Sequence, residues 1–198
     1  MTNLNGKAYA MTAITPMKPW KTPILRFLFW FTATVPGQTD DLVNLSFIHF
    51  ARWVIVRRDQ FPRLSESQPK EKLSYDYLIF FSNFNGTWNQ YIDAFSQVLA
   101  YGLDRVWKWS EKFTGAVPVT AFKRYITRGQ VEVDYYYNSY PYASTNDIKA
   151  AHRVNAAFEQ LAAATDRLSP EEFDQAWLQF LTQVQSDLGS LGSSPVGT

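Results

Sequence analysis

The chain has 198 residues, with 19 lysines and arginines against 18 aspartates and glutamates, two histidines and no cysteine. This length is typical of one domain with an appendage or of two small domains, and the near-neutral charge argues against nucleic acid as a partner. The absence of cysteine excludes disulfides, thiolate metal sites and cysteine nucleophiles, and with only two histidines a multi-histidine zinc site is not expected.

The first elements are a strand and an aromatic helix. Residues 7–15 alternate weakly between apolar and polar positions, which predicts a strand. Thr22 and Pro23 then predict the start of a helix that ends near Val35. At about 13 residues this helix is shorter than the roughly 20 needed to cross a bilayer. Two interpretations stay open: a buried core helix, or a helix that docks residues 20–35 on a membrane or a larger partner.

The middle of the chain predicts two long strands joined by a solvated connection. Residues 45–57 and 75–84 are apolar at nearly every position, and residues 57–72 between them are rich in charge, proline and serine.

The second half of the chain predicts more helix than strand. A turn at Asn85-Gly86 leads into an amphipathic helix, capped by Thr87. The elements expected from here on are a helix over residues 88–113, an extended basic stretch over 119–130, a strand over 131–138, and helices over 144–164 and 169–188.

The order strand, helix, strand, strand, helix, strand predicts an α+β fold, a ferredoxin-like βαββαβ plait with extra C-terminal helices. We expect residues 1–143 to form the ferredoxin-like domain, residues 144–188 a C-terminal helical extension, and residues 189–198 a disordered tail.

Both faces of the strand over residues 45–57 are apolar. Arg52 and Val54 share one face, and Trp53 and Ile55 share the other. An antiparallel sheet open to water would show polar residues at alternate positions, so we expect both faces to be covered. The simplest way to cover the second face is to pack it against the same sheet of a second copy, which gives a homodimer. The alternative is that the C-terminal helices pack on this face.

Candidate ligand-binding residues lie on these strands, in the turn that follows them and in the tyrosine-rich fourth strand. A buried arginine needs a carboxylate or an anionic ligand, so we expect Arg52 to pair with Asp93 or Asp76 or to bind a ligand. The predicted ligand-binding residues are His49, Arg52, Trp53, Asn83, Asn85, Tyr135 and Tyr137. No Walker loop, HExxH or GxSxG motif is present, so no catalytic residue is assigned and enzyme activity stays an open question.

Three blocks resemble those of an uncharacterised bacterial family. Residues 48–53 (IHFARW), 80–88 (FFSNFNGTW) and 135–141 (YYYNSYP) follow the order and spacing of the family's IHFARW, FFSNFDGSW and YSAYP blocks. That family is distantly similar to the dimeric α+β barrel superfamily, which includes dye-decolorising peroxidases. The resemblance implies an apolar pocket between sheet and helices, with haem as a candidate cofactor and His152 as its candidate ligand. Asn85 departs from the family's aspartate, and an amide cannot act as a general base.

Three functions follow from these observations. The first is a protein that binds an apolar small molecule or lipid in an aromatic-lined cavity. The second is a haem-dependent peroxidase-like enzyme with His152 or His49 as axial ligand, and the third is a peripheral membrane or assembly subunit. Since no secretory signal opens the chain, we expect a cytoplasmic location, with membrane association through residues 20–35 as the open alternative.

Overall fold

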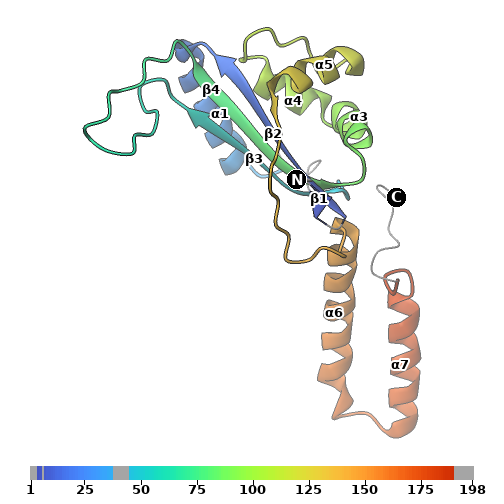
Figure 1. The fold of residues 1–198 in the computed structure, drawn as a ribbon. Helices are drawn as coiled ribbons and strands as arrows, with labels where there is room; N and C mark the ends of the chain where they lie inside the picture. The colour runs from blue at the N-terminus through green and yellow to red at the C-terminus, as the bar shows by residue number, and fades with distance from the viewer. Residues whose placement is uncertain (1–3, 6, 38–44, 190–198) are drawn as a thin grey trace.

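The computed structural model describes residues 4–5, 7–37 and 45–189, which fold as an α+β protein with an open antiparallel sheet (Figure 1). Its strands are β1 (Leu4–Asn5), β2 (Ala8–Met17), β3 (Ile48–Val56), β4 (Asp76–Asn85) and β5 (Gln130–Val131). Its helices are the short 3-10 helix η1 (Pro19–Lys21), α1 (Thr22–Thr34), α3 (Trp88–Val98), α4 (Ala100–Trp107), α5 (Val119–Gly129), α6 (Thr145–Thr165) and α7 (Pro170–Val184).

The sheet has the order β1-β2-β4-β3, and β5 pairs with the same edge of β2 as β1 does, further along the strand. Every pair is antiparallel. The predicted strands over residues 7–15, 45–57 and 75–84 are confirmed, each shifted by no more than a few residues. This arrangement is consistent with the ferredoxin-like α+β class.

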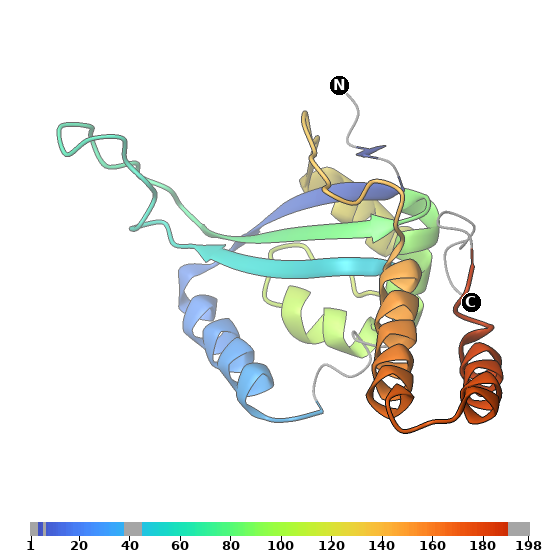
Figure 2. The same ribbon diagram turned by 90° about the horizontal axis from the view of Figure 1, so that it is seen from below.

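Helices cover one face of the sheet. Ala13, Phe80 and Trp53 lie opposite one another across β2, β4 and β3 and therefore share this face. Helices α1, α3 and α4 contribute Leu25, Phe95 and Trp107 to the same core as these residues, and Figure 2 shows the three helices together on one side of the sheet. Phe80 is 1% exposed and has the rings of Trp53 and Trp107 at 4.9 Å and 5.1 Å, so it lies at the centre of the main core.

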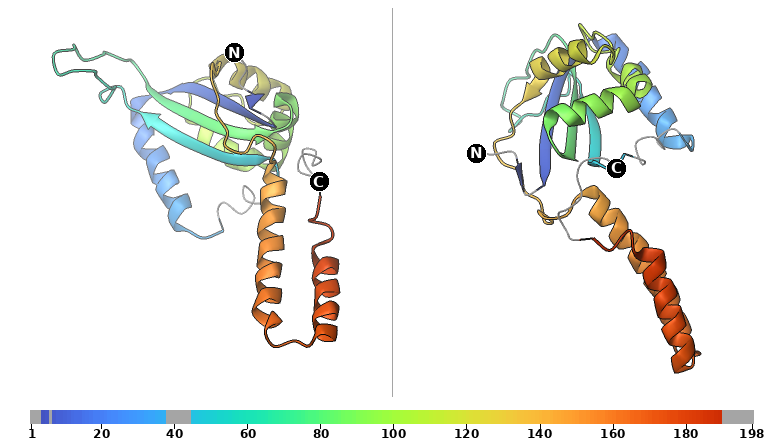
Figure 3. Two further views of the ribbon diagram at one scale, coloured as in Figure 1. Left: turned by 60° about the horizontal axis from the view of Figure 1, so that its bottom comes forward. Right: turned by 90° about the vertical axis from the view of Figure 1, so that its right-hand side faces the viewer.

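The opposite face of the sheet is open within the described chain, and we call it the open face. Ile14, Ile79 and Val54 lie opposite one another there and are half-buried, and Phe50 is 48% exposed. The alternative that the C-terminal helices cover this face is wrong, because α6 and α7 run away from the end of the sheet (Figures 1 and 3).

In the single chain Arg52 is exposed on the open face, and neither of the two predicted carboxylates pairs with it. Its guanidinium lies 4.8 Å from the centre of the Phe81 ring. The two carboxylates expected to pair with it are engaged elsewhere: Asp93 pairs with Lys123 at 2.7 Å, and Asp76 accepts the Arg58 backbone N–H at 2.9 Å. In the single chain water reaches the Arg52 side chain, so the guanidinium needs no carboxylate partner there.

Three element predictions need correction. The helix expected over residues 88–113 is broken at Leu99 into α3 and α4. The basic stretch after Pro118 is helix α5, because Phe122 and Ile126 at four-residue spacing bury one of its faces. The fourth strand ends at Val131 instead of 138; because β1 pairs with Tyr9 on the same edge of β2, β5 could continue along that edge by no more than two residues.

Helices α6 and α7 form an antiparallel hairpin that confirms both C-terminal helix predictions. Ser144 and Ser169 each cap one helix by accepting a backbone N–H in a capping box. The hairpin has a small hydrophobic cluster of its own, made by Ala157, Leu161, Phe180 and Val184. The tail predicted over 189–198 lies, except for residue 189, outside the described residues. Among the described helices, none has the length and apolarity that membrane crossing requires.

Candidate functional site

An apolar cleft of about 380 Å³ lies between the helices and the covered face of the sheet. Helix α1 contributes Leu28 and Phe29, β3 contributes Trp53, and the end of α3 contributes Phe95 and Val98. The remaining described lining residues come from α1, the segment after it, and the α3–α4 region: Thr32, Gly37, Leu99, Tyr101, Gly102, Leu103, Arg105 and Val106. The volume is at the lower end of the range for small-molecule sites, and the lining is predominantly hydrophobic as in such sites.

Trp53 lines the cleft and is surrounded by other rings. Its ring centre lies 4.9 Å from that of Phe80, 6.0 Å from that of Trp107 and 6.3 Å from that of Phe29. The indole Nε1–H is enclosed and has no hydrogen-bond acceptor among the described residues. Trp53 therefore contributes an aromatic ring to the lining of the cleft, and its indole donor is not used by the described residues.

The polar groups of the cleft are few. The Thr32 hydroxyl already donates to the backbone carbonyl oxygens of Leu28 and Phe29, at 3.1 Å and 3.0 Å. Among the described lining residues Arg105 is the charged one; it is half-buried, and its guanidinium lies 5.5 Å from the centre of the Tyr101 ring. The lining of the cleft is therefore predominantly apolar, with Arg105 as its charged member.

Gly102 leaves part of the cleft open. A Cβ added at this position of α4 would meet no atom within 4 Å, and Gly102 lines the cleft. A larger side chain at residue 102 can therefore occupy this space without first displacing the neighbouring structure.

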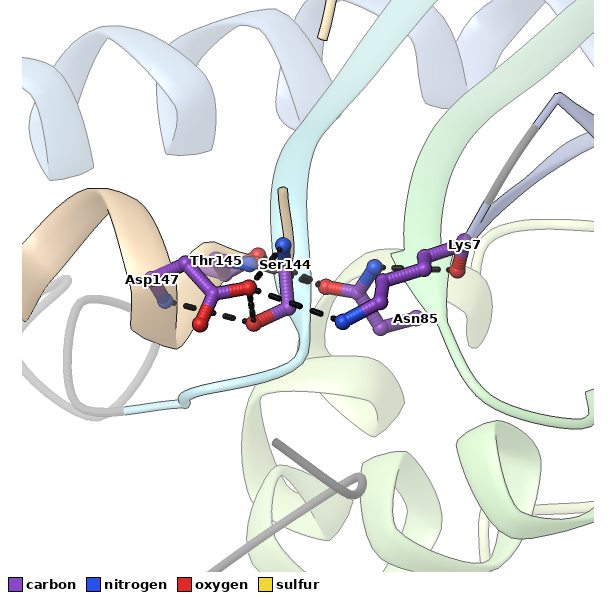
Figure 4. Close-up of polar contacts among 5 residues, drawn as sticks. All are labelled: Lys7, Asn85, Ser144, Thr145 and Asp147. Carbon is purple, nitrogen blue, oxygen red and sulfur yellow. Dashed lines mark hydrogen bonds and ion pairs between the residues drawn. The ribbon is translucent and has the colours of Figure 1, made fainter. Parts of the chain in front are cut away.

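Asn85 lies outside the cleft, in a polar junction between the sheet and α6 (Figure 4). Its side-chain oxygen accepts hydrogen bonds from the backbone N–H and the hydroxyl of Thr145, at 3.0 Å and 3.1 Å, and its amide nitrogen donates to the Lys7 carbonyl oxygen at 3.0 Å. The Lys7 ammonium lies 3.7 Å from the Asp147 carboxylate, which also accepts from Ser144. The junction thus fixes the start of α6 to the ends of β2 and β4.

His49 adjoins the same junction. The register of β3 against β4 shifts between Ile48 and Phe50, so His49 occupies a bulge. The His49 imidazole is half-buried, and its Nε2 has no hydrogen-bond partner among the described residues. Burial lowers the pKa of His49 below its ordinary value of 6.5, and a hydrogen bond with Asn85 opposes this shift in part.

We expect His49 to make stability depend on pH. Because its pKa is lower in the folded chain, the unfolded chain binds a proton first as the pH falls. The stability associated with neutral His49 is present above pH 6.5 and is lost as the pH falls through the lower, folded-state pKa. Urea unfolding over a pH series should show this decline in the wild type and a shallower one in His49→Gln. Equal slopes in the two proteins would contradict the assignment.

The structure separates the other predicted site residues. Asn83 is 7% exposed on β4, whereas Tyr135 and Tyr137 are 75% and 70% exposed in the segment after β5. His152 is exposed on α6, away from the residues that line the cleft. Of the seven predicted ligand-binding residues, Trp53 alone is among the described residues that line the cleft. His49 and Asn85 are brought together at the junction.

Sequence reasoning missed most of the cleft. Phe95, Val98, Leu99 and Val106 form a stripe at helical spacing, which indicates a core-facing surface but does not show where the core is incompletely filled. The described residues contain no group of three or more histidine, aspartate and glutamate side chains placed to hold a metal ion. Haem ligation by His152 or His49 stays a prediction.

No family model matches this chain, and comparisons with curated proteins and with solved structures also find no match.

Proposed function

We propose that this protein binds an amphipathic small molecule, such as a lipid-derived anion, in the cleft between α1, Trp53 and the α3–α4 region. The observation that carries the proposal is the cleft itself, which is walled by aromatic and aliphatic side chains and has Arg105 as its charged lining residue. Burial of an apolar body would supply most of the binding free energy, and the guanidinium would orient the anionic end.

The ligand-binding experiment uses 1-anilinonaphthalene-8-sulfonate, a probe with an aromatic body and a sulfonate, followed by fluorescence titration. We expect saturable binding by the wild type and at least about tenfold weaker binding by Gly102→Trp, because the new ring would fill the space next to residue 102. Arg105→Gln should weaken binding of the sulfonate while leaving the apolar walls in place.

Gly102→Ala is the matched control, because a methyl group at residue 102 meets no neighbour and leaves most of the volume open. It should bind the probe like the wild type and raise the free energy of unfolding by about 0.5–1 kcal/mol, since alanine favours a helix more than glycine does. Saturable probe binding that is unchanged in folded Gly102→Trp would overturn the proposal.

We also propose that the sheet and its helices form a ferredoxin-like plait that pairs with a second copy through the open face. The plait is supported by the alignment of β3, β4, β2 and β5 side by side. The pairing is supported by the apolar character of the open face, where Ile14, Val54 and Ile79 are only half-buried in one chain.

Sedimentation velocity at several protein concentrations tests this pairing. The wild type should sediment as a dimer, and Ile79→Lys should shift it to the monomer, because it adds a second positive charge beside Arg52 in the middle of the interface. Val54→Lys, on the neighbouring strand, should act in the same way. A wild type that stays monomeric, or a dimer that persists in both folded variants, would show that the open face is not the interface.

A further inference from the structure

Helix α1 has an apolar outer surface that the described part of the chain leaves exposed. Trp20, just before the helix, is 62% exposed, and along the helix Ile24, Phe27 and Trp30 are 39%, 62% and 60% exposed. The rings of Phe27 and Trp30 lie 5.6 Å apart. We call these four residues the outer stripe.

The outer stripe is unusual for a helix at a protein surface. The opposite side of α1 is already used, because Leu25 is buried and Leu28 and Phe29 pack against the core. A helix with one face in water normally has polar residues on that face, whereas α1 is apolar around most of its circumference. Four large apolar side chains that follow one another along one side of the helix form a continuous patch, and such a patch indicates a docking site.

The charges around the outer stripe have one predominant sign. From residue 18 to residue 37 the chain has lysine and arginine but no aspartate or glutamate. Lys21 is paired with Glu111 at 2.9 Å, whereas Lys18 and Arg26 are exposed. A hollow of about 520 Å³ beside the start of α1 brings Arg26 together with Arg57 and Arg58. Asp59 and the buried Asp76 are its acidic lining residues, and Asp59 pairs with Arg57 at 2.7 Å.

The connection between β3 and β4 lies at the same end of the molecule as the start of α1. The register of Met17 opposite Asp76 and of Val56 opposite Tyr77 brings the start of α1 and this connection to one end of the sheet, as Figure 2 shows. Within the connection Leu64 is fully exposed.

We propose that the outer stripe docks on an anionic membrane surface. Tryptophan is enriched where membrane meets water, and an apolar helix face flanked by arginine and lysine is typical of helices that lie in that interface. Arg26 and Arg58 would contact lipid phosphates beside the stripe, and the lack of acidic residues in the helix avoids repulsion from the anionic surface. This proposal uses the side of α1 opposite the cleft, so it does not depend on ligand binding there.

Vesicle flotation of the full chain tests the proposal, with vesicles of phosphatidylcholine alone or of phosphatidylcholine mixed with phosphatidylglycerol. We expect the wild type to float with the mixed vesicles, and to do so less as salt is raised. Phe27→Ser/Trp30→Ser should reduce the partition coefficient by at least about tenfold, because two exposed rings no longer enter the interface. Arg26→Glu/Arg58→Glu should reduce binding to the mixed vesicles specifically.

The matched controls carry the same changes elsewhere on the surface. Tyr135→Ser/Tyr140→Ser removes two rings that are 75% and 70% exposed, and Arg124→Glu/Arg128→Glu reverses two exposed charges on α5; both should float like the wild type. Circular dichroism establishes that each variant is folded, as expected for changes at exposed positions.

A wild type that does not float with the mixed vesicles would overturn the proposal. Equal flotation of the folded stripe variant would overturn it as well. A third contrary result is concentration-dependent self-association that the stripe variant abolishes while no vesicle binding is seen, since the stripe would then be a protein interface. None of these results alters the probe-binding comparison at Gly102, so the two proposals can fail separately.

Discussion

Phe80→Ala is expected to lower the free energy of unfolding by about 3–5 kcal/mol, the largest effect that we predict for a single substitution. The ring is 1% exposed, and the rings of Trp53, Phe95 and Trp107 lie 4.9, 5.9 and 5.1 Å from it. Removing it leaves a cavity that these large, rigid side chains cannot close, so the lost transfer free energy and the cost of the cavity add together. Urea unfolding measures the change.

The same substitution should weaken probe binding, because Trp53 and Phe95 line the cleft and both rest on Phe80. Phe61→Ala is the matched control: this ring is 46% exposed in the connection between β3 and β4, and its loss should cost less than about 1 kcal/mol. If Phe80→Ala were as mild as Phe61→Ala, the packing of the core would be different from that described.

Asn85→Leu is expected to lower the free energy of unfolding by roughly 2–4 kcal/mol. Leucine has a similar size but cannot accept from Thr145 or donate to the Lys7 carbonyl oxygen, so buried backbone groups lose their partners. Because the Asn85 side chain is 5% exposed, water does not readily replace these hydrogen bonds. Urea unfolding measures the stability, and amide hydrogen exchange in the first turn of α6 should increase more than exchange in α3.

Asn85→Asp distinguishes the role of the Asn85 side chain as an acceptor from its role as a donor. A carboxylate can still accept from Thr145, but it places an oxygen where the amide donated to the Lys7 carbonyl oxygen. We expect Asn85→Asp to be destabilised at neutral pH and to recover in part in acid, where the protonated carboxyl can donate. If Asn85→Leu were as stable as the wild type, the junction would have no role in holding α6.

The role of Asn85 also shows where sequence reasoning about the candidate site was limited. The turn at Asn85-Gly86 was identified correctly, and Gly86 adopts the positive φ of 85° that such a turn requires. Nothing in the neighbouring sequence indicated that the amide would bond to Thr145 and Lys7, which are far away along the chain. A polar residue at a turn was therefore interpreted as a ligand contact, whereas its hydrogen bonds are made within the protein.

The amino-acid sequence by itself determined the α+β class, the three long strands and the capped starts of α3, α6 and α7, because periodicity and helix capping act over a few neighbouring residues. It also indicated that both faces of β3 are apolar. Only the tertiary structure decided which face the helices cover, that Arg52 is exposed, and that a cleft lies between Trp53 and Gly102. These features depend on how well the side chains of distant segments fill the space between them, and packing of this kind leaves no periodic pattern in the sequence.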